Sequence, residues 1–348
     1  MANNIADQVL EQVNTIGDAI RNISDVTEID IATAEKDVVW EDGKVKLYHF
    51  RSDVAKRCET PVLISYALVN RWEMMDLQPN RSLIRKLLSE GIDIYLIDWG
   101  YASKLDRYKT MEDYISGNIH DCVNFLKKKY DLPAINLLGV CQGGTFGLIY
   151  TALNPQNIKN LVTLVTPVEF DIDDGLLFTW ARDMDVDAIV DNFGGVVPGE
   201  FLNSGFDLLK PMNKTRKYLA LPQTMQNKDA LMNFLRMEKW VADSPDQAGE
   251  TYRQFIKEFY QQNRLIKGAF KLGGRTVDLK NIKMPVLTIY ARADHIVPPE
   301  STKPIKDAVG SKDNQLMEFP GGHIGVFVGS RSQQVLTPAI AQWLIERD

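Results

Sequence analysis

The sequence predicts an α/β fold in which a mostly parallel sheet has helices on both faces and carries an inserted, largely helical cap. One observation is a set of short, nearly continuous apolar runs, which are typical of strands buried on both faces: 61–68, 92–100, 135–140, 161–167 and 285–291. A second is that helical patterns separate the early runs, near 81–90, 111–130 and 142–154. A third is that this alternation stops between about 171 and 280, where helical patterns dominate.

The chain begins with a pattern that predicts an amphipathic helix over residues 1–30. Apolar side chains recur there at helical spacing among polar ones, at Ile5, Val9, Val13, Ile16 and Ile20. Such a helix could dock on its own domain or could meet a partner protein or an apolar surface, and both interpretations stay open. After it, residues 38–50 are typical of two strands around an Asp-Gly turn.

These patterns divide the chain into parts. After the helix over 1–30, residues 31–170 form the first part of the core, 171–280 the cap and 281–348 the last part of the core. A helix over 339–347 closes the chain. Within the cap, Ser244–Gln247 predicts the start of a helix, with proline at the first helical position and glutamine three residues after the capping serine.

Composition excludes several classes of function. A net charge of −6 over 348 residues gives no basic surface for nucleic acid, and no apolar run is long enough to span a membrane. The first residues do not have the pattern of a signal peptide. The three cysteines are far apart and odd in number, which favours a reducing, cytoplasmic compartment, and the four histidines lack metal-ligand spacing. We therefore expect neither a metal nor a cofactor.

One stretch carries the chemistry. Gly139–Gly143 reads G-x-C-x-G, between a predicted strand and a predicted helix, and places Cys141 at the centre. This is the pattern of a nucleophile elbow, in which the nucleophile occupies a strained turn and glycines remove side chains that would crowd it. The helix N-terminus that follows favours the thiolate form of a cysteine. A small buried thiol in a glycine-rich turn is the alternative.

The partners that an elbow cysteine needs occur in the expected chain order of nucleophile, acid and base. Asp294 follows the strand 285–291, and His323 follows the apolar run QLMEFP with two glycines before it. This order is that of the α/β-hydrolase fold, and it predicts His323 as the base and Asp294 as the group that orients it. His295 is an alternative base, and Asp98, which also ends a strand, is an alternative acid. The other histidines, His49 and His120, are interpreted as structural or solvated, and Cys58 and Cys122, which lack glycine turns, as inert.

An oxyanion hole is expected beside Cys141. The backbone N–H of Gln142, the residue after the nucleophile, is the predicted first donor. The second donor is expected in the loop after the strand 61–68, at Val69, with Leu68 as the nearest alternative.

At these residues the sequence resembles the polyhydroxyalkanoate synthases, specifically the catalytic subunit of the two-component class III enzymes. The resemblance covers almost the whole chain after about residue 35, through stretches such as YALVNRW, NLLGVCQGGTF, FLRMEKWVADSPDQAGETYRQFIKEFYQQN, ARADHIVPP and FPGGHIG. It implies polymerisation of (R)-3-hydroxyacyl-CoA, chiefly 3-hydroxybutyryl-CoA, into polyester with release of CoA. By position it implies that Cys141 is acylated, that Asp294 is the acid and that His323 is the general base.

The resemblance also implies where the protein acts and with what. It implies residence on cytoplasmic polyester granules and a second, non-catalytic synthase subunit, and we expect a homo-oligomer within that complex. Possible contacts for CoA are Arg253, Tyr252 and His295, although a solvated helix face also explains the first two. Rival interpretations are a thioesterase or polyester hydrolase of the same fold, and an inactive scaffold protein.

Overall fold

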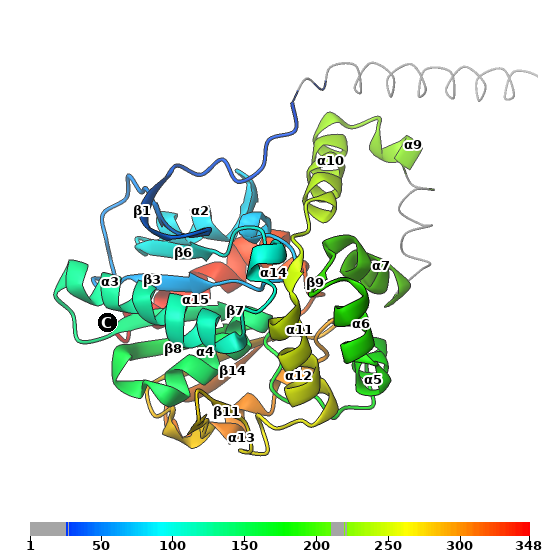
Figure 1. Ribbon diagram of the computed structural model, residues 1–348. Helices are drawn as coiled ribbons and strands as arrows, with labels where there is room; N and C mark the ends of the chain where they lie inside the picture. Colours follow the sequence, from blue (N-terminus) through cyan, green and yellow to red (C-terminus); the bar gives the residue numbers. More distant parts are fainter. Residues whose placement is uncertain (1–25, 27, 210–218, 220) are drawn as a thin grey trace, which may run out of the picture.

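A computed structural model describes residues 26, 28–209, 219 and 221–348, so the predicted helix over 1–30 lies almost wholly outside the described residues. An eight-stranded sheet forms the centre of the molecule (Figure 1), in the order β1-β2-β6-β3-β7-β8-β13-β14. The strands pair in parallel from β6 to β14, whereas the hairpin of β1 and β2 is antiparallel. Their bounds are Lys36–Asp42, Val45–Phe50, Ile94–Asp98, Val62–Ser65, Ile135–Val140, Ile158–Leu164, Val286–Ala291 and Asn314–Phe319. The predicted fold class is confirmed.

Helices cover both faces of this sheet. Successive strand residues point to opposite faces, so Leu63 belongs to one hydrophobic cluster while Val62 and Ile64 belong to the other. Figure 1 shows α3 and α4 on one face and α2 and α15 behind the sheet on the other, and their apolar residues fall into the matching clusters. These helices span His120–Tyr130, Gln142–Leu153, Leu83–Ser89 and Thr337–Ile345, and a π-helical segment, Asp113–Ile119, leads into α3.

Most of the chain between β8 and β13 is helical. Figure 1 shows α5, α6, α7 and α10 together to one side of the sheet. The helices of this region are Leu176–Asp183 (α5), Val186–Asn192 (α6), Gly199–Leu209 (α7), Leu221–Thr224 (α9), Lys228–Ala242 (α10) and Gly249–Phe255 (α11), followed by a π-helical segment, Ile256–Gln261. Two short antiparallel pairs accompany them, Val196–Val197 (β9) with Gln247–Ala248 (β10) and Lys271–Leu272 (β11) with Arg275–Thr276 (β12). The domain boundaries drawn at 30, 170 and 280 stay predictions.

One predicted helix start is wrong. Helix α11 begins at Gly249, not within Ser244–Gln247, because Gln247 pairs with Val197 in the strand pair β9–β10. The side chain of Asp246 accepts a hydrogen bond from the backbone N–H of Gly199 (3.0 Å) and so holds the same two segments together. Pairing with a distant segment has overridden the local capping signal.

The remaining elements are short. They comprise β4 (Asp76–Gln78), β5 (Arg81–Ser82), α12 (Pro299–Thr302), α13 (Ile305–Ala308), α14 (Gly325–Val328), a π-helical segment (Ser332–Leu336) and 3₁₀ turns at Trp72–Met75, Lys104–Asp106, Pro155–Asn157 and Leu279–Asn281. Within the described ranges, no helix combines the length and apolarity needed to cross a bilayer.

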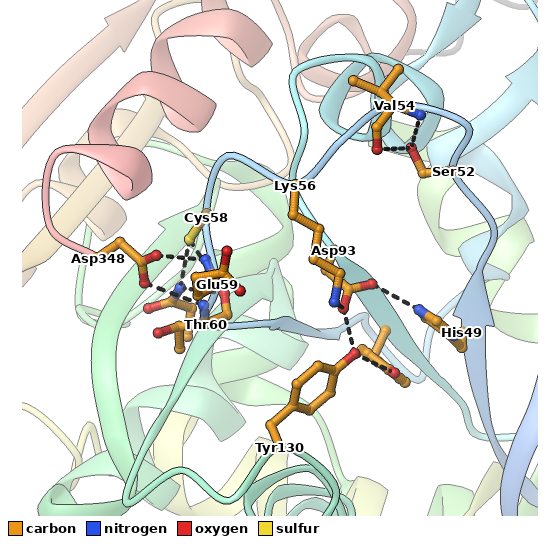
Figure 2. Close-up of polar contacts among 12 residues, drawn as sticks. His49, Ser52, Val54, Lys56, Cys58, Glu59, Thr60, Asp93, Tyr130 and Asp348 are labelled. Atoms are coloured by element: carbon orange, nitrogen blue, oxygen red, sulfur yellow. Dashed lines mark hydrogen bonds and ion pairs between the residues drawn. The ribbon is translucent and has the colours of Figure 1, made fainter.

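A polar network joins segments at the amino-terminal ends of β3 and β6 (Figure 2). The buried carboxylate of Asp93 accepts hydrogen bonds from Lys56 Nζ (2.6 Å) and Tyr130, and pairs with His49 Nε2 (2.7 Å). These partners lower the pKa of Asp93 well below its usual range, although burial alone would raise it. Parallel strands carry functional sites at their carboxyl ends, which supports a structural role for this network, and the interpretation of His49 stays a prediction.

Candidate active site

Cys141 occupies a sharp turn between β7 and α4. Its φ and ψ are 51° and −125°, a conformation that residues other than glycine rarely adopt. Hydrogen bonds hold it there, from Cys141 N–H to Leu164 O (2.9 Å) and from Gly144 N–H to Cys141 O (2.9 Å). A strained backbone kept in place by its surroundings is typical of a functional position.

The glycines on either side of Cys141 are required by close approach of the backbone. A Cβ atom on Gly139 would lie 2.4 Å from the Cα of Gly144. A Cβ atom on Gly143 would lie 2.3 Å from the carbonyl oxygen of Ser65 and 2.4 Å from that of Tyr66. The elbow therefore packs directly against the end of β3, which brings the sulfur to the carboxyl edge of the sheet.

Asp294 and His323 reach the same edge from the loops after β13 and β14. His323 Nδ1 lies 2.7 Å from Asp294 Oδ2, and both residues are buried. The other carboxylate oxygen, Oδ1, accepts the backbone N–H groups of Ile296 and Val297, each at 2.9 Å. Asp294 is thus held by its own loop and presents one free oxygen to the imidazole.

The surroundings of His323 favour its protonated form. Burial on its own lowers the pKa of His323, but the charge of Asp294 and its hydrogen bond, together with a hydrogen bond to Cys141, raise this pKa to about 10. At neutral pH the ring therefore carries a proton that it can give to a leaving group. Once it has given that proton up, the neutral ring can take one from an incoming nucleophile.

Backbone donors suited to an oxyanion lie beside the sulfur. Gln142 is the first residue of α4, where the N–H has no partner within the helix. Its side-chain Oε1 accepts the N–H of Leu68 (3.0 Å), so Leu68, the alternative second donor, is already bound. In the part of the chain that the structure describes, the Val69 N–H has no acceptor, and Val69 lines the same cavity as Cys141.

A cavity of about 310 Å³ opens at Cys141, Gln142 and His323. Its wall is mainly apolar and comes largely from the helices between β8 and β13, including Met184, Leu202, Phe206, Met237 and Trp240. Such a cavity suits an acyl chain and disfavours water near the sulfur.

Three polar residues of this cavity were not predicted as site residues from the sequence: Tyr66, Gln247 and Tyr260. Burial, and in second place the charge of Cys141, raise the pKa of both Tyr66 and Tyr260. The tyrosines resemble ordinary core residues in a single sequence, because only the tertiary structure brings them to the sulfur.

Asp98 and His120 do not line the cavity at Cys141, and each is hydrogen-bonded to another residue. Asp98 accepts two hydrogen bonds from Arg71, at 2.8 and 3.1 Å, and His120 Nδ1 lies 3.2 Å from the hydroxyl of Tyr150. Burial raises the pKa of Cys58 to about 12 and also raises that of Cys122, which is consistent with inert thiols. Asp294, and not Asp98, contacts a histidine beside Cys141.

The possible CoA contacts do not gather at one place. Tyr252 lines the cavity, and its hydroxyl contacts Met184 Sδ at 3.4 Å. Arg253 instead forms ion pairs with three carboxylates, those of Asp187, Asp191 (2.9 Å) and Glu250 (3.2 Å), and is not a lining residue. His295 is half-buried next to Asp294 and is likewise not part of the cavity wall. Because three carboxylates already neutralise the Arg253 guanidinium, it is poorly suited to bind phosphate.

Comparison with known proteins now decides the family. A model described as the alpha/beta hydrolase fold matches residues 60–330, and one described as the poly-beta-hydroxybutyrate polymerase (PhaC) N-terminus matches residues 14–87. The poly(3-hydroxyalkanoate) polymerase subunit PhaC of Allochromatium vinosum is 46% identical over 99% of this chain and 97% of its own length. The chain belongs to the PhaC family. The PhaC subunit of Synechocystis is 48% identical over 94% of this chain and 89% of its own length.

Solved structures agree with the fold of this PhaC family member. A putative lipase from Sulfolobus solfataricus superposes with a TM-score of 0.57 at 13% identity, covering 90% of this chain and 99% of the lipase. A monoacylglycerol lipase from Paleococcus ferrophilus gives 0.52 at 17% identity, covering 87% and 99%. At such identities the likeness shows the α/β-hydrolase fold alone. The resemblance noted in the sequence is confirmed at the level of the family.

Proposed function

We propose that this chain polymerises (R)-3-hydroxyacyl groups from CoA thioesters into polyester through a covalent thioester on Cys141. The observation that carries the proposal is that the elbow cysteine and His323, which is paired with Asp294, line the same apolar cavity. Membership of the PhaC family supports the same reaction, because the relatives are named as poly(3-hydroxyalkanoate) polymerase subunits.

In the first step the sulfur of Cys141 attacks the thioester carbonyl. A carbon–sulfur bond forms to the enzyme, the bond to CoA breaks, and the CoA sulfur takes its proton from His323. The backbone N–H groups of Gln142 and Val69 stabilise the charge on the carbonyl oxygen. Since one thioester replaces another, the acyl group stays activated, whereas transfer to serine would have given a less reactive oxyester.

In the second step a 3-hydroxyl group attacks the acyl-enzyme. His323 takes the hydroxyl proton, an ester bond forms, and the sulfur of Cys141 is released. We assign this proton to His323 and not to Asp294, because both oxygens of Asp294 are already occupied, one by the imidazole and one by two backbone N–H groups. The lengthened chain is then a CoA thioester that can acylate a cysteine again.

The apolar wall supports a polymerase over a hydrolase. Water must be kept from the acyl-enzyme for the hydroxyl to compete, and the helices between β8 and β13 cover the sulfur with apolar side chains. We propose 3-hydroxybutyryl-CoA as the main monomer. CoA contacts at Tyr252 and His295 remain part of the proposal, and Arg253 could contribute only if its ion pairs opened.

We also propose which partners the chain works with and where in the cell the reaction takes place. Relatives are named as subunits, and so we infer that this chain works with a second, non-catalytic synthase subunit and as a homo-oligomer within that complex. The insoluble product implies that the protein resides at cytoplasmic polyester granules.

The test is incubation of the purified chain, with and without a candidate second subunit, with 3-hydroxybutyryl-CoA. Free CoA together with polymer, and an acyl mass on the peptide containing Cys141, are the expected results. Free hydroxy acid in place of polymer would identify a thioesterase. The Cys141→Ala variant should keep its fold and lose both CoA release and polymer, and wild-type behaviour of that variant would point to an inactive scaffold.

A further inference from the structure

Gln247 has a buried side-chain amide without a partner. The residue is 3% exposed, and its Nε2 is buried with no hydrogen-bond acceptor among the described residues. No hydrogen bond of its carboxamide oxygen is found in that part of the chain either. Nearly all buried polar groups in proteins are paired, and an exception requires an explanation.

The strand pair β9–β10 fixes where this amide lies. Gln247 is opposite Val197 in that antiparallel pair, so its backbone is held and its side chain cannot move out to solvent by a small shift. Its side chain lines the cavity that contains Cys141 and His323. It also lines a much smaller neighbouring cavity of about 30 Å³, together with Tyr66, which faces both.

Packing alone does not account for a glutamine at this position. Leucine has a similar size and would bury the same surface without leaving a polar group unpaired. The wall around it is mainly apolar, although other polar side chains such as those of Tyr66, Asn70 and Tyr260 also line it. An unpaired amide in an apolar substrate cavity is suited to a polar group that arrives with the substrate.

A 3-hydroxyacyl thioester brings such a group. It differs from an ordinary acyl thioester of the same length by the hydroxyl at C3, whose oxygen accepts hydrogen bonds. We propose that Gln247 is a specificity-determining residue whose side-chain amide forms a hydrogen bond with the substrate's 3-hydroxyl. This inference rests on the proposed function and adds the residue that distinguishes hydroxylated from plain acyl-CoA.

The expected effect follows because leaving a buried polar group unpaired costs more free energy than its hydrogen bond contributes when formed. A site built to pair with a substrate hydroxyl rejects the analogue without it, because the buried group stays unpaired in that complex. Replacing Gln247 by leucine removes the bond to 3-hydroxybutyryl-CoA and costs nothing for butyryl-CoA. We expect the preference for the hydroxylated substrate to fall by about 10- to 100-fold.

The experiment measures single-turnover CoA release from 3-hydroxybutyryl-CoA and from butyryl-CoA. Wild type should prefer the former, and Gln247→Leu should lose that preference through a slower reaction with the hydroxylated substrate alone. The melting temperature should stay the same or rise, because an unpaired buried amide has been removed. Gln247→Met, with a flexible apolar side chain, should behave in the same way even if leucine packs poorly.

A matched control is Gln254→Leu in the neighbouring helix α11. The Gln254 side chain already accepts the N–H of Met111 (2.8 Å) and does not line the cavity, so this variant should melt earlier and keep the substrate preference. An unchanged preference in both Gln247 variants would overturn the inference while leaving the proposed function intact. No CoA release by wild type from 3-hydroxybutyryl-CoA would overturn the proposed function and this inference with it.

Discussion

Replacing Asp294 by asparagine should separate the two chemical steps. Oδ1 of Asp294 accepts two backbone N–H groups at 2.9 Å, so the asparagine oxygen should stay there and its NH₂ group should take the place of Oδ2. That NH₂ would face His323 Nδ1, which now lies 2.7 Å from a carboxylate oxygen. Two donors cannot pair, and so the imidazole should turn to the tautomer that carries its proton on Nε2. This tautomer cannot accept a proton from a nucleophile.

The size of the effect differs between the steps because the two nucleophiles differ in acidity. A free cysteine thiol has a pKa of about 8.5, so roughly 3% of it is thiolate at pH 7 without any base, and acylation should slow by about 30-fold. An alcohol ionises far less readily and depends fully on the base. The same change in a serine triad costs about 10⁴ in kcat through the wrong tautomer, and we expect elongation to slow by about 10³- to 10⁴-fold.

The assay follows the burst of CoA release for acylation and the steady-state release for elongation, at the same enzyme concentration. Asp98→Asn is the matched control, since Asp98 pairs with Arg71 at 2.8 Å, and it should lower stability without separating the burst from the steady state. Equal slowing of both steps in Asp294→Asn would refute this division of roles. So would a steady-state rate close to that of wild type.

Other predictions concern stability. The pKa of His323 is raised to about 10, so its contribution to stability should be complete below about pH 6.5 and should be lost as pH rises through about 10. The difference in unfolding free energy between wild type and His323→Gln, followed by urea titration from pH 6 to 10, should therefore shrink with pH; a growing difference would contradict it. Gly143→Ala should prevent correct folding, because its Cβ atom would lie 2.3 Å from a backbone carbonyl oxygen, while Gly205→Ala, where nothing lies within 4 Å, should fold normally by circular dichroism. Asp93→Asn should cost about 2 kcal/mol near neutral pH, discounted because its Lys and His partners are partly exposed. Since the pKa of Asp93 is lowered, that loss should begin to shrink as pH falls below about 4 and should disappear only as pH falls through the lowered pKa, and thermal melts at several pH values test it.

Several features of the site follow from local signals in the sequence. The glycines around Cys141 mark a turn where two backbones approach closely, and the structure has the expected contacts at Gly139 and Gly143. Asp294 and His323 each follow a strand, and the carboxyl ends of parallel strands meet at one edge, so their proximity could be expected. Their catalytic roles stay proposals that the experiments above test.

Other features depend on contacts between segments far apart in the chain. The pattern at Ser244–Gln247 predicts a helix, yet pairing with β9 makes Gln247 part of a strand and places this residue in the wall of the cavity. The choice between Leu68 and Val69 as an oxyanion donor was open, and the side chain of Gln142 binds the N–H of Leu68, which supports the proposal of Val69. Neither outcome has a signal within a few residues of the position concerned.

The sequence by itself determined the order of strands and helices, the elbow and the family, because periodicity, glycine spacing and long matching stretches are properties of neighbouring residues. The tertiary structure alone decided which polar groups face the sulfur and which are already paired. A hydrogen bond depends on distance and direction between atoms, and for Gln142 with Leu68, or Gln247 with no partner, these are set by how the whole chain packs.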